Sequence, residues 1–266
     1  MLIKGSRKTV TPLLIGAALS PLIAQPVLAQ VLPQLGKAPL EQVVAALTLQ
    51  EKVALVTGQG MAFPGLPEDM QAPAVGSIEN KVEGAAGATV AVPRLGIPSL
   101  VLADGPAGVR ISPTRKDAPG RSFHATGFPI GTALASSWDR SLVQQVGAAI
   151  GDEAAAYGID VMLTPAQNIH RYPLGGRNYE YYAEDPVVSG QIAAALVKGL
   201  QERGVGASMK HYAVNNHEWN RSTINVKVDE RALREIYLKG FEITAREGQP
   251  WTVMSSYNKL NGTYTS

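Results

Sequence analysis

The chain has no cysteine among its 266 residues. This absence excludes disulfide bonds and thiolate metal sites, so that a hydrophobic core has to supply the stability. With 45% hydrophobic side chains, the chain can bury a core in one domain or in a large part of one. The formal net charge is only +2, which indicates no surface for a polyanion such as nucleic acid. After residue 28 no apolar stretch is long enough to span a bilayer.

Acidic residues are missing from the first 40 positions, and three basic side chains lie within the first ten: Lys4, Arg7 and Lys8. They precede an apolar run over residues 10–28, and the pattern predicts a secretory signal peptide over residues 1–29. A buried core helix is the alternative, but three prolines interrupt this run and break helical continuity. Cleavage after Ala29 would remove the three basic residues and change the net charge from +2 to −1. We therefore expect an exported protein, periplasmic or extracellular, that binds neither nucleic acid nor, after cleavage, a membrane.

Residues 30–93 are expected to form an N-terminal helix and loop segment. Apolar residues recur at helical spacing over residues 34–57, and Thr48 precedes Glu51 in a capping-box pattern. A loop rich in Gly, Pro and Ala follows up to about residue 93.

Short β-rich runs and amphipathic helical stretches alternate over residues 94–266. The β-rich runs are residues 99–103, 130–135, 160–164, 205–209 and 252–254. The helical stretches are residues 139–157, 185–203 and 229–246, each opened by an Asp that can cap the helix. This alternation predicts the α/β class, with parallel strands joined by crossover helices.

Polar side chains gather just after these runs. They are Asp104 and Arg110 after the first run, His170, Arg177 and Glu180 after the third, Lys210 and His211 at the end of the fourth, and Tyr257 past the fifth. In a closed (β/α)8 TIM-type barrel such strand ends converge on one face, where active sites are built. A doubly wound open sheet is the alternative, but its glycine-rich turn leads into a helix, and none follows GPAG here.

Each of these residues also has a purely structural interpretation. Asp104 beside glycine can be a turn former, and Arg177 can be an ion-pair partner of Glu180 or Glu184. Lys210 must either reach the barrel mouth or find a carboxylate, because an unpaired buried ammonium is costly. His217 and Glu218 resemble part of a zinc helix, but no second His follows at the required spacing, so no metal site is predicted.

Sugars suit this set of side chains. Each hydroxyl both donates and accepts, so that carboxylates and long cationic donors can fix several of them through charge-assisted hydrogen bonds. Three aromatic side chains are candidates to cover the apolar face of the ring: Tyr179, Trp219 and Tyr257. The glycine-flanked stretch GGRNYEYYAEDP is accordingly interpreted as a polyol-recognition loop.

The motifs LADGPAGVR, GGRNYEYYAEDP, KHYAVNNHE and VMSSYN, in this order, resemble the N-terminal barrel of glycoside hydrolase family 3, the β-glucosidase type. The resemblance extends to TLQEKVALVTG, VPRLGIPSLVLADGP and FPIGTALASSWD. It implies that seven residues bind the non-reducing glucose-like unit: Asp104, Arg110, Arg177, Lys210, His211, Met254 and Tyr257. The substrate implied is a β-glucoside or a short oligosaccharide, and no cofactor or metal is required.

The family's nucleophile is an Asp in a Ser-Asp-Trp setting, and its acid/base Glu comes from a second domain. No Ser-Asp-Trp occurs in this sequence, so both carboxylates are expected beyond Ser266 and no catalytic residue is assigned. The chain is therefore expected to be a barrel incomplete at its C-terminus, poorly stable and inactive alone, because about five of eight strands leave an open edge. Three alternatives stay open: a non-catalytic carbohydrate-binding fragment, a β-xylosidase of the same family, and a lyase or aldolase that uses Lys210 as a Schiff-base amine.

Overall fold

The computed structural model describes residues 32–58, 82–116 and 118–266. The chain divides into two units, Met1–Leu32 and Pro33–Ser266, and the account below concerns the second. The predicted signal peptide lies outside the described residues, and so do residues 59–81 of the predicted N-terminal loop. Within the described part, no helix combines the length and apolar character that crossing a membrane requires.

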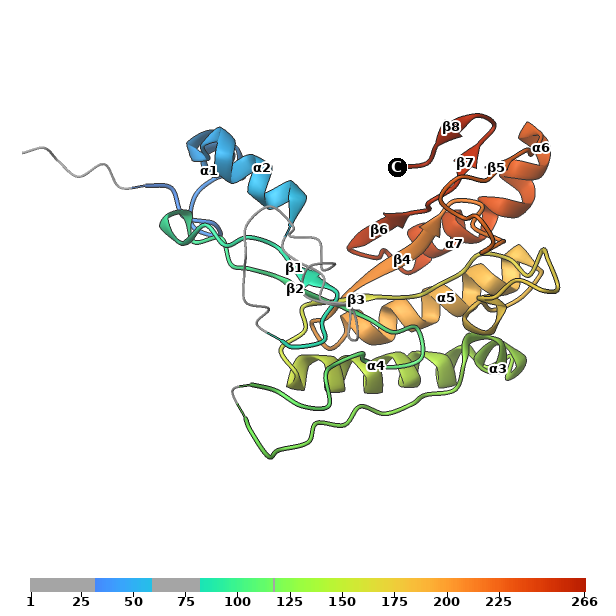
Figure 1. Cartoon of the computed structure of the whole chain (residues 1–266), viewed down its shortest axis with the longest axis horizontal. Helices are drawn as coiled ribbons and strands as arrows, with labels where there is room; N and C mark the ends of the chain where they lie inside the picture. The colour runs from blue at the N-terminus through green and yellow to red at the C-terminus, as the bar shows by residue number, and fades with distance from the viewer. Residues whose placement is uncertain (1–31, 59–81, 117) are drawn as a thin grey trace, which may run out of the picture. The chain divides into compact units, whose positions relative to one another are not determined.

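A five-stranded sheet with the order β1-β2-β3-β4-β6 organises the fold (Figure 1). Its strands are β1 (Gly87–Ala88), β2 (Val101–Asp104), β3 (Val161–Leu163), β4 (Gly206–Tyr212) and β6 (Thr252–Ser255). β1 runs antiparallel to β2, whereas β2, β3, β4 and β6 are parallel to one another. A smaller sheet joins β5 (Asn225–Val226), β7 (Lys259–Leu260) and β8 (Thr263–Tyr264).

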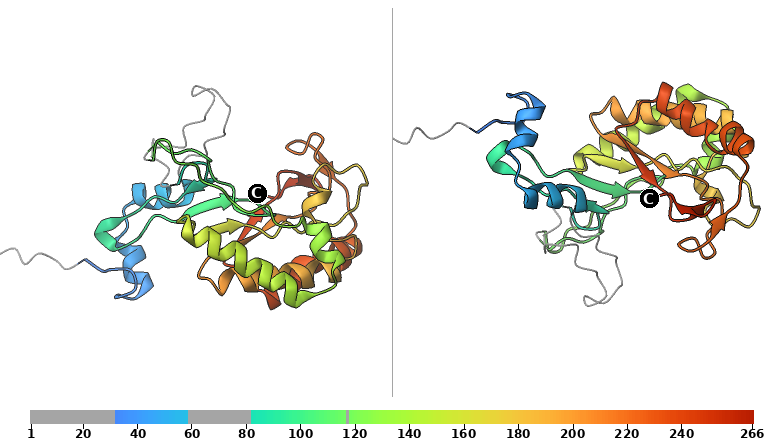
Figure 2. Two further views of the ribbon diagram at one scale, coloured as in Figure 1. Left: turned by 90° about the horizontal axis from the view of Figure 1, so that it is seen from below. Right: turned by 90° about the horizontal axis from the view of Figure 1, so that it is seen from above.

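Helices connect the parallel strands and pack side by side on one face of the sheet (Figure 2). α4 (Arg140–Ala156) lies between β2 and β3, and α5 (Pro186–Gln201) between β3 and β4. α6 (Glu230–Ala232), the π-helical turn η4 (Leu233–Tyr237) and α7 (Lys239–Glu247) lead to β6. A doubly wound sheet carries helices on both faces, so the arrangement confirms an α/β fold of the incomplete barrel type.

One predicted strand is wrong. Residues 130–135 form no strand but the helix α3 (Gly131–Ser136), so the described part of the main sheet contains four parallel strands and not five. A short apolar run fits a buried helix as well as a strand, and periodicity does not separate the two. Tertiary contacts fix the helix here, because Thr132 Oγ1 donates to the carbonyl oxygens of Asn178 (3.1 Å) and Tyr181 (3.0 Å).

The predicted helix starts are confirmed. Asp139, Asp185 and Asp229 each accept a hydrogen bond from the backbone N–H three residues later, at the N-termini of α4, α5 and α6. The helical pattern of residues 34–57 is two helices, α1 (Leu40–Ala46) and α2 (Leu49–Thr57). Thr48 separates them because it is the extended N-cap of α2, where it forms the predicted capping box with Glu51.

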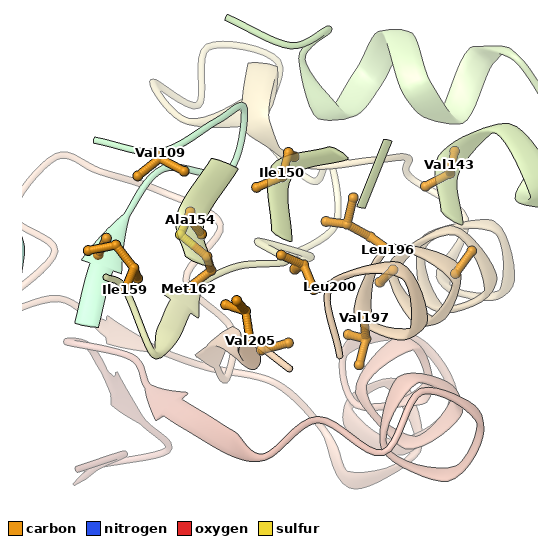
Figure 3. Close-up of a cluster of buried hydrophobic side chains, with 14 of the residues drawn as sticks. Val109, Val143, Ile150, Ala154, Ile159, Met162, Leu196, Val197, Leu200 and Val205 are labelled. Atoms are coloured by element: carbon orange, nitrogen blue, oxygen red, sulfur yellow. The ribbon is translucent and has the colours of Figure 1, made fainter. Parts of the chain in front are cut away.

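The main core lies between α4, α5 and the sheet (Figure 3). Ile150, Leu196 and Leu200 are fully buried there, and each contributes about 1.5–3 kcal/mol by leaving water. Glycines allow the two helices to approach closely: a Cβ at Gly199 would lie 2.0 Å from the carbonyl oxygen of Gln144. This tight layer holds the strands whose C-terminal ends carry the candidate site.

Candidate functional site

A cavity of about 710 Å³ lies at the C-terminal ends of the parallel strands. All seven residues predicted to bind a sugar line it: Asp104, Arg110, Arg177, Lys210, His211, Met254 and Tyr257. They come from β2, β4 and β6 and from the loops that follow the strands. Segments more than 150 residues apart in sequence, such as Asp104 and Tyr257, thus meet in one place. Their role in substrate binding stays a prediction.

Lys210 and Asp104 form the central ion pair of the cavity. Lys210 Nζ donates to Asp104 Oδ1 at 2.6 Å; the lysine side chain is 2% exposed and the aspartate 38%. Burial, the largest influence, raises the pKa of Asp104, but the charge and hydrogen bond of Lys210, with smaller contributions from Gly105 N–H and Arg110, lower it below its usual 3.8. Asp104 is therefore an ionised acceptor, as sugar recognition requires, and the expected carboxylate partner of Lys210 is found.

Arg177 and Glu180 form a second pair on the turn η3 (Asn178–Glu180). Arg177 Nε donates to Glu180 Oε1, and the glutamate side chain is 3% exposed. Burial alone would lower the pKa of Arg177, but the hydrogen bond and the charge of Glu180 raise it above its usual value. Of the two partners considered for Arg177, the structure selects Glu180, and the guanidinium still faces the cavity.

His211 is a neutral imidazole in this setting. Burial is the main cause that lowers its pKa to about 2, and the charges of Arg177, Lys210 and Arg221 lower it further. The His211 backbone is fixed on both sides by Asn168, whose Oδ1 accepts from the amide N–H and whose Nδ2 donates to the carbonyl, each at 3.0 Å. A neutral imidazole offers one donor and one acceptor to a hydroxyl.

Only some of the other aromatic and polar residues considered from the sequence line the cavity. Tyr179 and Tyr257 line the cavity, whereas Trp219 does not and lies 73% exposed in a separate hollow. His170 does not line the cavity either; its Nε2 lies 2.9 Å from the Asn178 carbonyl oxygen, where it braces the recognition loop. His124 is exposed and does not line the cavity.

Some lining residues were not predicted from the sequence. The C-terminal end of α2 and strand β1 form one wall, and Arg221 another. Arg221 Nη1 donates to Glu218 Oε2 at 2.9 Å, and its guanidinium carbon lies 4.3 Å from the ring centroid of Tyr257. Arg221 lies on the loop that follows the strand of Lys210, so its position after a strand end could have predicted that it lines the cavity. The contribution of α2 has no such signal in the sequence, because it depends on tertiary packing alone.

The chemistry available is hydroxyl binding. Among the described residues that line the cavity, the carboxylates are Asp104 and Glu180, and both are engaged with cations. Groups of three or more His, Asp or Glu that could hold a metal are absent from the described part of the chain. The wall can thus fix a polyol by charge-assisted hydrogen bonds, while a free carboxylate for nucleophilic attack is not among its described residues.

Comparison with known proteins identifies the family of this chain. The sequence profile of the Glycosyl hydrolase family 3 N terminal domain matches residues 67–266. Thermostable beta-glucosidase B of Acetivibrio thermocellus is 50% identical over 182 residues, which are 67% of this chain and 24% of that protein. An exo-alpha-(1->6)-L-arabinopyranosidase of Bifidobacterium longum is 43% identical over 174 residues, 64% of this chain and 23% of that protein.

Among solved structures, beta-glucosidase 3B from Thermotoga neapolitana in complex with alpha-D-glucose superposes with a TM-score of 0.77 and 53% identity, over 85% of this chain and 30% of that one. The chain spans about a quarter of the length of the curated relatives it matches. The profile match covers three quarters of the sequence, and the structural match agrees with the incomplete-barrel fold. The chain belongs to glycosyl hydrolase family 3, and the part of it that matches the family is the N-terminal domain.

Proposed function

We propose that the protein carrying this chain is a retaining β-glycosidase that removes terminal, non-reducing β-D-glucosyl units from β-glucosides or short oligosaccharides. The observation that supports this most directly is the cavity in which the Asp104–Lys210 pair, Arg177 and His211 meet. Similarity to beta-glucosidases, one of them solved with glucose, supports the same substrate class.

In this proposal the described residues bind and orient the sugar. The ionised Asp104 accepts hydrogen bonds from ring hydroxyls, while Lys210 and Arg177 donate to them. The neutral His211 donates to one hydroxyl without adding charge. Retaining hydrolysis then needs two carboxyl groups about 5–5.5 Å apart, a nucleophile that forms a glycosyl-enzyme and an acid/base that activates water. We assign these two roles to groups outside the described residues.

The Schiff-base alternative is disfavoured by the position of Lys210. A Schiff-base lysine needs a neutral amine, whereas the Lys210 ammonium is held 2.6 Å from an ionised carboxylate. A non-catalytic sugar-binding protein remains the competing proposal, since the described wall alone can bind a polyol.

Hydrolysis of chromogenic glycosides by the complete gene product tests the proposal. We expect release from the β-D-glucoside, with slower release from the β-D-xyloside and the α-L-arabinopyranoside, and a first-formed sugar of retained anomeric configuration by NMR. The arabinopyranoside is included because a relative carries that activity in its name. Binding of glucose without hydrolysis of any of the three would favour the carbohydrate-binding alternative; an inverted product would refute the retaining mechanism.

We also propose export, which the basic and apolar pattern of residues 1–29 supports. The protein recovered from the periplasm or medium of an expressing cell should have the intact mass of a chain that begins at residue 30. Recovery of an uncleaved chain from the cytoplasm alone would contradict export.

A further inference from the structure

Three rings lie side by side on two loops next to the cavity. The ring centroids of Tyr172 and His217 are 4.8 Å apart, and those of His217 and Trp219 are 6.4 Å apart. With Leu174, Gly176 and Glu218 they line a separate hollow of about 450 Å³. Trp219 is 73% exposed there, although an indole is large and apolar and is usually well buried.

This hollow adjoins the sugar-binding cavity through the same two loops. Gly176 in the hollow is followed directly by Arg177 in the cavity. Glu218 in the hollow is hydrogen-bonded to Arg221, which lines the cavity and covers Tyr257. The Glu218–Arg221 pair therefore contributes one residue to each space, and the two spaces are neighbours.

The side chains of the hollow match a sugar better than an apolar partner. Aromatic rings pack against the C–H face of a pyranose, and a carboxylate beside them accepts hydrogen bonds from its hydroxyls. Glu218 is held in place for this task by Arg221 at 2.9 Å and by Asn215 Nδ2 at 3.2 Å. The volume is in the range of small-molecule sites and far below a protein interface.

We propose that Tyr172, His217, Glu218 and Trp219 form an outer saccharide subsite, which binds a sugar unit of the substrate beyond the one held in the cavity. This inference rests on the proposed function and adds to it a preference for β-glucosides of two or more sugar units over substrates with a small aglycone.

Kinetics of the complete gene product test the subsite. We expect Trp219→Ala to lower the ratio of kcat/KM for cellotriose to kcat/KM for methyl β-D-glucoside by about tenfold, the loss of about 1.4 kcal/mol of contact with the outer unit. Trp219→Phe, which keeps an aromatic face, should restore part of the ratio. Trp138→Ala is the matched control, because Trp138 is 78% exposed and lines none of the hollows described here; its ratio should equal that of the wild type. An unchanged ratio in Trp219→Ala would overturn the proposal.

A binding measurement separates this proposal from the proposed function. Thio-linked cellotriose, which resists hydrolysis, should change the tryptophan fluorescence of the wild type and not that of Trp219→Phe. If the protein hydrolyses no glycoside but this signal is present, the subsite stands and the catalytic proposal fails. If hydrolysis occurs and the signal is the same in both proteins, the subsite fails and the catalytic proposal stands.

Discussion

Removal of the Asp104 carboxylate tests the centre of the site. In Asp104→Ala the Lys210 ammonium stays 98% buried and loses the carboxylate 2.6 Å away. Breaking a fully buried ion pair in this way costs about 3–5 kcal/mol. Asp104 is 38% exposed to the cavity, so water can take part of its place, and we expect a smaller loss of about 2–3 kcal/mol in unfolding free energy. For a domain of this size, that loss lowers Tm by roughly 5–10 °C.

The same change should remove activity more strongly than stability. Charge-assisted hydrogen bonds contribute about 1.5–3 kcal/mol each, so loss of an acceptor for two hydroxyls should lower kcat/KM at least roughly 100-fold. Thermal unfolding and hydrolysis of a chromogenic β-glucoside, both with the complete gene product, measure the two effects. Near-normal turnover by Asp104→Ala would refute the assignment of Asp104 to sugar binding.

Two comparisons isolate the ion pair. Asp152→Ala breaks an exposed pair with Arg203, 3.4 Å long, and should change stability by less than about 0.5 kcal/mol. The double variant Asp104→Ala, Lys210→Met leaves no buried charge unpaired and should recover most of the Tm lost in Asp104→Ala, but none of its activity. The electrostatic reasoning is refuted if Asp104→Ala and Asp152→Ala have the same Tm, or if the double variant is less stable than the single one.

Further predictions concern protonation, capping and packing. Because the pKa of Asp104 is lowered, its ion pair stabilises the fold at pH values above the usual carboxyl pKa of 3.8. The Tm advantage of wild type over Asp104→Asn should therefore shrink as the pH falls below that value. A Tm advantage that grows there would contradict the lowered pKa. Because the pKa of His211 is lowered from 6.5 to about 2, unfolding binds a proton between these values, so stability should decline with falling pH less steeply in His211→Gln than in wild type. Thr48→Ala removes the capping box of α2 and should cost about 1 kcal/mol in urea denaturation, whereas no loss would show that α2 is held by other contacts. Gly199→Ala places a Cβ 2.0 Å from a backbone oxygen of α4 and should cost about 1–3 kcal/mol; an equally stable variant would mean that α4 and α5 can move apart freely.

Local chemistry explains which elements the sequence could predict. The helix starts at Asp139 and Asp185 depend on a side chain and a backbone N–H three residues away, and both are where the pattern places them. The helix α3 was predicted as a strand, because what decides its form is a distant turn that accepts hydrogen bonds from Thr132. The number of parallel strands was wrong for the same reason.

The site was predictable to the extent that it lies at strand ends. Parallel strands bring their C-terminal ends together, which is why Asp104 and Lys210 meet. Trp219 was placed in the cavity on composition alone, and the structure puts it behind Glu218 in a hollow of its own. Nothing in the sequence around Thr57 indicates that the end of α2 contributes to the cavity wall, since that contact depends on how two distant segments pack.

The charge of the cavity wall indicates that, in the proposed enzyme, the described residues bind the sugar and other residues carry out the chemical steps. The described ionised lining consists of four cations and two carboxylates: Arg110, Arg177, Lys210 and Arg221, with Asp104 and Glu180. His211 adds no charge because its imidazole is neutral. Glycoside cleavage passes through an oxocarbenium-like state, whose positive charge such a wall does not stabilise. The wall is suited to bind hydroxyl groups. Its four cations and two carboxylates leave an excess of two positive charges, which two further carboxylates would neutralise. We infer that the nucleophile and the acid/base, entering from outside the described residues, supply both the chemistry and the charge that this cavity lacks.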